Sequence, residues 1–193
     1  MDLKSYLKTH NKTHLIFDLD ETILHLIMPW NEWERDIEDQ LKKIDGKIFN
    51  DYKNRKINLN QMQNAYISSH PQTKNLIVRN NENFESKYLK EIRVNQKLVN
   101  LIKNLKGYQL SIWSANSKST IKKTLKKVDI LEKFKKLITR DDVDFLKPDS
   151  QGFNKIWDHK TPKSKYVFIG DSTNDKNSAH AAGIDFYKED YFK

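Results

Sequence analysis

Short apolar runs alternate with amphipathic stretches along most of this chain. An apolar run of four or five residues is typical of a buried strand, whereas apolar residues spaced three or four positions apart predict a helix. The runs that predict strands lie at 14–18, 109–113, 137–139, 166–170 and 184–187. The spacing predicts helices from 30 to about 46, at 60–69, in a short stretch near 84–89, and at 95–107, 118–128, 151–157 and 175–182, with a turn at 80–83.

The order of these elements predicts the fold class. Strands that alternate with helices imply right-handed crossovers and a mainly parallel sheet with helices on both faces. We therefore expect an α/β protein with a Rossmann-like core. At 193 residues the chain is long enough for one such core with a smaller insert, and too short for two full domains.

Polar side chains follow three of the predicted strands, at the point where each strand ends. They are Asp18 and Asp20 after the first, Ser114 and Asn116 after the second, and Asp171, Ser172 and Asp175 after the strand at 166–170. In a parallel sheet, ligands bind beyond the carboxyl ends of the strands. We therefore expect these groups to meet at one edge of one sheet.

Four carboxylates gathered at one edge would repel each other unless a cation lay among them. Oxygen ligands without His or Cys favour a hard ion, and a neighbouring phosphate favours Mg²⁺ over Ca²⁺. The Ser114 hydroxyl, the N–H groups at the start of helix 118–128, and Lys147 suit a phosphoryl group. Pro148 restricts the backbone of Lys147, which helps to aim its charge.

The composition excludes some classes of function and makes others less favoured. The absence of cysteine excludes a disulfide framework, a thiolate nucleophile and a cysteine metal site. The net charge of +9 raises the question of nucleic acid, but the lysines are spread along the chain, so nucleic acid is the less favoured partner. Residues 1–12 lack the apolar stretch of a signal peptide, and no long apolar run follows. We expect a cytoplasmic protein without a membrane partner.

Four motifs carry a resemblance to a known family. They are Phe17-Asp18-Leu19-Asp20-Glu21-Thr22, Ile112-Trp113-Ser114-Ala115-Asn116, Lys147-Pro148 and Gly170-Asp171-Ser172-Thr173-Asn174-Asp175. In this order and at strand ends, they resemble the motifs of the haloacid dehalogenase superfamily. The likeness runs from residue 14 to residue 187. It leaves 26–90 outside, and that segment is similar to the helical cap of many members. The resemblance implies a catalytic core of residues 1–25 and 91–193 and a cap of residues 26–90.

The resemblance also implies roles for single residues. Asp18 would attack phosphorus to form an aspartyl-phosphate, and Asp20 would protonate the leaving oxygen and then activate water. Mg²⁺ would be held by Asp18, the backbone carbonyl of Asp20 and Asp171, with Asp175 in support. The phosphoryl oxygens would be bound by Ser114, the N–H groups of Ala115 and Asn116, and Lys147. The family's dehalogenases lack the second aspartate and its ATPase pumps carry threonine there, so Asp20 favours a phosphatase or phosphomutase.

The predicted function is therefore a Mg²⁺-dependent phosphatase of the capped branch that acts on a small phosphorylated metabolite. One alternative is a nucleotide or nucleic-acid end phosphatase, and another is a non-catalytic module that binds a phospho-ligand. The binding module is disfavoured because binding alone does not require Asp20. Trp30 and Trp33 could stack on a nucleobase, but their helical spacing favours a place in the core of the cap. His25 could reach the site, although packing is the commoner role for such a histidine.

Overall fold

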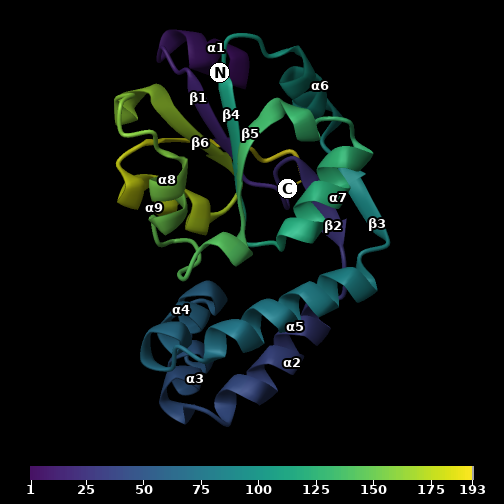
Figure 1. Cartoon of the computed structure of the whole chain (residues 1–193), viewed down its shortest axis with the longest axis vertical. Helices are drawn as coiled ribbons and strands as arrows, with labels where there is room; N and C mark the ends of the chain where they lie inside the picture. The colour runs from purple at the N-terminus through teal and green to yellow at the C-terminus, as the bar shows by residue number, and fades with distance from the viewer. Residues whose placement is uncertain (193) are drawn as a thin grey trace.

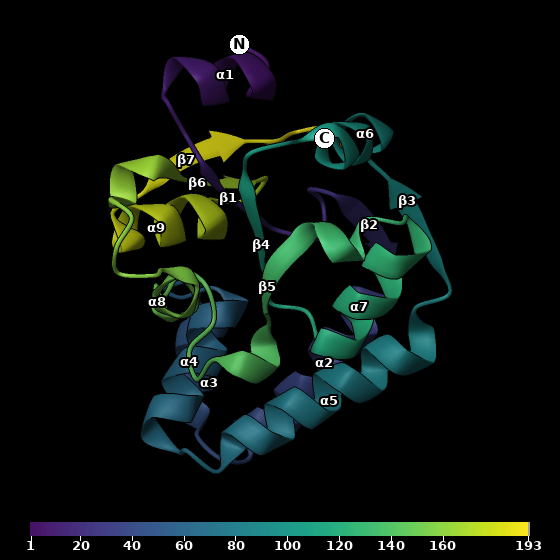
Figure 2. The same ribbon diagram turned by 45° about the horizontal axis from the view of Figure 1, so that its top comes forward.

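The core of the protein is a five-stranded parallel sheet. The computed structural model describes residues 1–192. The strands follow the order β5-β4-β1-β6-β7, and each pairs with its neighbours in parallel register (Figures 1 and 2). Their bounds are β1 His14–Phe17, β4 Gln109–Trp113, β5 Phe134–Ile138, β6 Tyr166–Gly170 and β7 Asp185–Lys188. The expected α/β class with a Rossmann-like core is confirmed.

Helices cover both faces of the sheet because both faces are apolar. Side chains alternate across a strand, so β1 directs Leu15 and Phe17 into one apolar cluster and Ile16 into another. The first cluster includes side chains of α1 (Leu3–Thr9), α6 (Gln96–Asn104) and α7 (Lys118–Lys127). The second includes side chains of α8 (Gln151–Ile156) and α9 (Thr173–Ala182) (Figure 2). Short 3₁₀ helices lie at Leu131–Lys133, Arg140–Asp142 and Lys163–Lys165.

A helical segment is inserted between two short strands that lie outside the main sheet. Strands β2 (Leu24–Ile27) and β3 (Glu91–Val94) form an antiparallel pair and lead into and out of this segment. Its helices are α2 Trp30–Lys42, α3 Gly46–Lys53, α4 Leu59–Ser69 and α5 Thr73–Tyr88. These helices span residues 30–88 of the predicted cap of residues 26–90, and from here on the word cap refers to residues 30–88. The cap has its own apolar cluster, built around Trp33, Ile37 and Tyr66, and it lies beside the sheet in both views (Figures 1 and 2).

The cap differs from the sequence prediction in its last helix. The predicted turn at 80–83 is wrong, because α5 runs without a break from Thr73 to Tyr88. The Asn-rich stretch has low helix propensity, but tertiary packing overrides it. Ile77 and Phe84 are buried in the cap cluster, and Asn81 Nδ2 donates to Glu85 Oε1 one turn later at 2.9 Å.

Smaller differences concern element boundaries. The predicted helix from 30 to about 46 ends earlier, at Lys42. A separate helix that was not predicted, α3, begins at Gly46, where Asp45 Oδ1 accepts hydrogen bonds from Lys47 N and Ile48 N. The predicted strand at 137–139 begins earlier, at Phe134. Strands β2 and β3 and helix α1 were not predicted, since each is short and carries polar residues. No helix among residues 1–192 has the length and apolar character needed to cross a membrane.

Candidate active site

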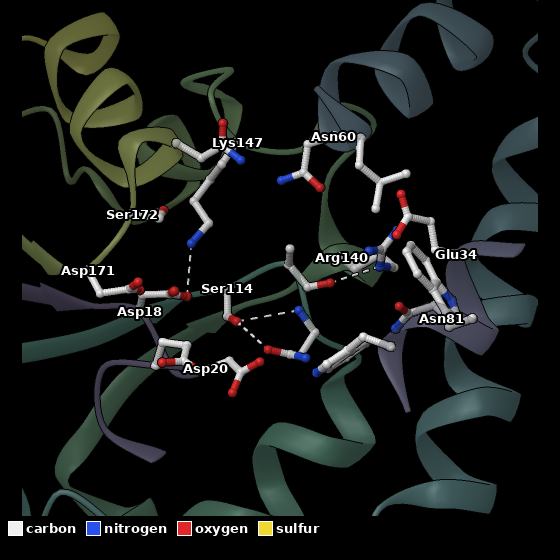
Figure 3. Close-up of a pocket in the computed structure, with 17 residues that line it drawn as sticks. Asp18, Asp20, Glu34, Asn60, Asn81, Ser114, Arg140, Lys147, Asp171 and Ser172 are labelled. Carbon is white, nitrogen blue, oxygen red and sulfur yellow. Dashed lines mark hydrogen bonds and ion pairs between the residues drawn. The ribbon is translucent and has the colours of Figure 1, made fainter. Parts of the chain in front are cut away.

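The strand register brings the predicted site segments to one edge of the sheet. Phe17 pairs with Ile112 on β4 and with Ile169 on β6. Strands β1, β4 and β6 all end within two residues of these paired positions. Asp18, Ser114 and Asp171 therefore lie at the same edge of the sheet. All three line one cavity, which Figure 3 shows in close-up.

A tight turn after β1 keeps Asp18 and Asp20 together. The carbonyl of Leu19 accepts hydrogen bonds from the N–H groups of Ile23 at 2.9 Å and Leu24 at 3.0 Å, so the chain folds back at once. Glu21 takes a left-handed backbone conformation with φ 60° in this turn. Asp20 Oδ1 accepts a hydrogen bond from Leu26 N at 2.8 Å. Both aspartates therefore line the cavity although the strand does not continue.

Lys147 provides a buried positive charge beside Asp18. Its side chain comes from the loop between β5 and α8, and its Nζ lies 2.9 Å from Asp18 Oδ1 (Figure 3). The same Nζ lies 2.5 Å from Asp175 Oδ1. Burial opposes the charged form, but the carboxylates of Asp175 and Asp18 outweigh it and raise the pKa of Lys147. The peptide bond between Lys147 and Pro148 is cis. The ammonium group thus holds two carboxylates at the sheet edge.

Asp175 is fixed by the start of α9. Ser172 N and Ser172 Oγ donate to Asp175 Oδ2 at 3.0 and 2.6 Å, and Asp175 N donates to Ser172 Oγ at 3.2 Å, which forms a capping box. A Cβ at Gly170 would lie 2.7 Å from Asp175 Oδ2, so only glycine permits this approach. Since Lys147 and Ser172 contact both carboxylate oxygens of Asp175, its surroundings suit a supporting role.

The loop after β4 presents polar groups at the same edge. Ser114 N donates to Ile138 O on β5 at 3.0 Å, which fixes the start of the loop. Ser114 Oγ donates to Asn116 Oδ1 at 2.9 Å. Ser117 then begins α7, and its side chain accepts a hydrogen bond from Thr120 N. The loop brings Ser114, Ala115 and Asn116 to the cavity beside the start of a helix, an arrangement suited to an anion.

Glu85 of the cap holds this loop from the other side. The Glu85 side chain is 1% exposed. Its Oε1 accepts from Asn116 Nδ2 at 2.9 Å, and its Oε2 accepts from Ser117 N at 3.1 Å and from the Ser117 hydroxyl. A cap residue therefore orients Asn116, the residue to which the Ser114 hydroxyl donates. The sequence does not reveal this contact, because its partners are 31 and 32 positions apart.

The cavity between core and cap has a volume of about 410 Å³. Its wall includes the predicted residues Asp18, Asp20, Ser114, Ala115, Asn116, Lys147 and Asp171. The remaining wall residues that carry polar or aromatic groups are Glu21, Trp30, Trp33, Glu34, Asn60, Asn81, Arg140, Ser172 and Asn174. Trp30 and Trp33 belong to the cap cluster and also face the cavity. His25 Nδ1 lies 2.5 Å from Glu21 Oε1 and 3.9 Å from Asp20 Oδ1, so it neighbours the site.

The sequence matches one family over nearly its whole length. The family model described as haloacid dehalogenase-like hydrolase covers residues 15–188. The chain belongs to this family. A comparison with curated proteins returns no match.

Solved structures agree with this assignment at the level of the fold. A haloacid dehalogenase-like hydrolase from Bacteroides fragilis has a TM-score of 0.64 and 21% identity over 92% of this chain and 87% of its own. The HAD-hydrolase YfnB from Bacillus subtilis, described as bound to magnesium, has a TM-score of 0.57 and 20% identity over 94% and 89%. A predicted phosphoglycolate phosphatase from Haemophilus somnus has a TM-score of 0.59 and 17% identity over 92% and 84%.

The donor set of this hydrolase fits Mg²⁺. Carboxylate oxygens of Asp18, Asp171 and Asp175 all lie within 4.8 Å of one another. Burial raises the pKa of Asp18, and burial is also the main cause that raises the pKa of Asp20 to about 7. Buried carboxylates that resist ionisation gain most from a nearby cation, and an all-oxygen set suits a hard one. Asp18, Asp171 and Asp175 could each offer one oxygen to such an ion, and Lys147 and Ser172 already hold the two oxygens of Asp175.

We predict that Mg²⁺ stabilises the hydrolase, and more so at higher pH. Because the folded pKa of Asp20 exceeds its ordinary value of about 3.9, the metal-free native state binds protons more tightly, and its stability falls as pH rises from about 4 to about 7. A metal ion favours the ionised carboxylates and opposes this loss. A concentration a hundred times the dissociation constant adds about 2.7 kcal/mol, or a rise in Tm of roughly 5–10 °C. Melting curves with EDTA and with Mg²⁺ at several pH values measure the difference.

In Asp171→Ala most of the difference in Tm between EDTA and Mg²⁺ is expected to vanish. Asp39→Asn, on the exposed side of α2, is expected to keep this difference. A wild-type Tm that does not respond to millimolar Mg²⁺ at any pH contradicts the metal assignment.

We further predict that Glu85→Ala lowers both stability and activity. The substitution leaves the buried donors of Asn116 and Ser117 without their acceptor, at a cost on the order of 3 kcal/mol. It also frees Asn116, so kcat/KM falls even below the melting range. Glu82→Ala, an exposed position on the same helix, is the matched control. Equal Tm and equal kcat/KM for the two variants would show that Glu85 does not hold the loop.

Proposed function

We propose that this hydrolase is a Mg²⁺-dependent phosphatase that hydrolyses a small phosphomonoester through an aspartyl-phosphate. The observation that carries the proposal is the placement of Asp18. The residue is 7% exposed, and its carboxylate faces the cavity, with Lys147 on one side and Asp171 close by. A second carboxylate, Asp20, lines the same cavity two residues later. A nucleophile, a fixed cation and a proton carrier thus surround one space.

In the first step, a carboxylate oxygen of Asp18 attacks phosphorus and the bond from phosphorus to the ester oxygen breaks. Asp20 gives its proton to the departing oxygen. In the second step, water transfers a proton to Asp20 and attacks phosphorus, which releases inorganic phosphate and restores the Asp18 carboxylate. Throughout both steps Lys147, the Ser114 hydroxyl and the N–H groups of Ala115 and Asn116 bind the phosphoryl oxygens. Bound Mg²⁺, held by Asp18, the carbonyl of Asp20 and Asp171, would supply charge neutralisation at the same oxygens.

A small substrate is supported by the shape of the cavity. The cap supplies Trp30, Trp33, Asn60 and Asn81 to its wall, so the leaving group would be enclosed by cap side chains. An enclosed leaving group is protected from bulk water and selected for size. A cavity of about 410 Å³ is of the size that holds small molecules and is too small for a folded phosphoprotein segment.

A nucleotide is the second candidate, because Trp30 and Trp33 line the cavity and could stack on a base. A panel of sugar phosphates, phosphorylated hydroxy acids, mononucleotides and a 3′-phosphorylated oligonucleotide, each with Mg²⁺, separates the two. Preference for the oligonucleotide together with a steep loss of rate at moderate NaCl would support a nucleic-acid end phosphatase instead.

The mechanism predicts distinct losses for its two aspartates. Asp18→Asn is expected to abolish turnover, because an amide of the same shape is a poor nucleophile. Asp20→Asn is expected to lower kcat for an alkyl phosphate by about 10²–10⁴, the usual contribution of a positioned acid–base group. Steady-state rates and Tm are measured beside Asp39→Asn as the matched control. Sustained turnover by a folded Asp18→Asn protein rules out the covalent route.

A further inference from the structure

Arg140 is a buried cation in the cavity that the proposed chemistry does not use. It follows β5 and is 5% exposed. Its Nε donates to Ala115 O at 2.8 Å, and its Nη1 donates to Gln63 Oε1 of the cap at 2.6 Å. Its guanidinium carbon lies 5.9 Å from the ring centroid of Trp33. These contacts fix the guanidinium in place, and none of them carries a negative charge.

The charge of Arg140 has no direct counter-ion among residues 1–192, where its side chain forms no salt bridge. Burial lowers the pKa of Arg140 to about 10, and the nearby carboxylates of Glu85 and Asp141 oppose this shift only in part. The Glu85 oxygens already accept hydrogen bonds from Asn81, Asn116 and Ser117. A buried cation without a paired anion is costly to the folded protein.

The guanidinium faces the cavity from the cap side. Figure 3 shows Arg140 on the wall opposite Lys147 and Asp18, and both walls belong to the same cavity. Arginine has five N–H donors in a fork that matches carboxylate or phosphate geometry, and two neutral acceptors leave part of that fork free. Because Arg140 contacts the carbonyl of Ala115, directly after Ser114, an anion on Arg140 would lie close to the phosphoryl group.

We propose that Arg140 binds a second anionic group of the substrate, so that the preferred substrates are compact phosphomonoesters that carry a carboxylate or a second phosphate. This inference rests on the proposed function, because it uses the same cavity. The phosphoryl group to be transferred lies at Lys147 and the loop after β4, and the second anion lies against Arg140 and the ring of Trp33. Arg140 is thus a specificity-determining residue rather than a catalytic one.

Glu34 limits where that second anion can lie. It lines the same cavity from α2 and accepts a hydrogen bond from the Tyr52 hydroxyl. Its negative charge repels a substrate anion, whereas Arg140 attracts it. Removal of the Arg140 charge should therefore lower the preference for the doubly charged substrate, and removal of the Glu34 charge should raise it. The two substitutions form a matched pair.

The test compares substrates that differ only in the second charge. Glycerol 3-phosphate is paired with 3-phosphoglycerate, and 3-hydroxypropyl phosphate is paired with 1,3-propanediol bisphosphate, so that the two pairs separate carboxylate from phosphate. The readout is the ratio of kcat/KM within each pair. In wild type at least one charged member is expected to be preferred by about 10- to 100-fold, the usual gain from a charge-assisted bidentate contact.

Arg140→Gln is expected to remove most of this ratio, and Arg140→Lys to keep part of it because the charge remains but the fork does not. Glu34→Gln is expected to raise the ratio by a few fold. Gln63→Leu removes the cap contact of Arg140 but keeps its charge, so the ratio is expected to persist. A ratio near one in wild type, or an equal fall for both members of a pair in Arg140→Gln, overturns the proposal. An equal fall in kcat/KM for both members would mean that Arg140 binds the transferred phosphoryl group, or that it acts only by holding Gln63 of the cap.

Binding separates a failure of this inference from a failure of the proposed function. Calorimetric titration of Asp18→Asn with 3-phosphoglycerate and with glycerol 3-phosphate requires no turnover. If wild type hydrolyses none of the substrates but Asp18→Asn binds the carboxylated one more tightly in an Arg140-dependent way, the anion site stands and the phosphatase assignment fails. Equal affinities of Asp18→Asn for both ligands overturn the anion site.

Discussion

A buried ammonium group between two carboxylates is the interaction on which the site depends. Lys147, Asp18 and Asp175 are each more than nine-tenths buried, and removal of Lys147 would leave two buried carboxylates without their cation. They come from three separate segments, namely the end of β1, the loop before α8 and the first turn of α9. The ion pairs therefore fix these segments relative to one another and aim Asp18 at the cavity. The parallel register of β1, β4 and β6 makes this possible, because it ends the strands at one edge.

Core and cap meet through polar contacts as well as through the cavity. Gln63 accepts from Arg140, Glu85 accepts from Asn116 and Ser117, and Asn64 Nδ2 donates to Leu146 O at 2.8 Å. Hydrogen bonds of this kind are replaced by bonds to water when two parts separate, so their net contribution is modest. We therefore expect the cap to open for substrate entry without a large loss of stability. Glu85 and Arg140 also contact the loop at 114–117, so closure of the cap and order of that loop are coupled.

The sequence predicted the core and the meeting of the polar residues at its strand ends because these signals are local. Apolar runs of four or five residues end at Asp18, Ser114 and Asp171. In a parallel sheet these three residues must then lie at the same edge. The full length of helix α5 was missed because its Asn-rich stretch has a low helix propensity. The packing of Ile77 and Phe84 in the cap cluster overrides that propensity. Arg140 and Glu85 were missed because their partners are distant in sequence, 77 positions away for Gln63 and 32 for Ser117. Only the folded chain reveals that these charges are buried beside the site.

The central claim is that Asp18 carries the phosphoryl group during turnover. It is tested most directly with Asp20→Asn and an aryl phosphate, whose leaving group needs no proton while hydrolysis of the intermediate still needs a base. Mixing followed by acid quench and mass analysis should show a burst of phenol of one equivalent and a phosphoryl group on the peptide that contains Asp18. A phosphoryl group on another residue, or turnover without a burst and without modification of Asp18, would contradict the account.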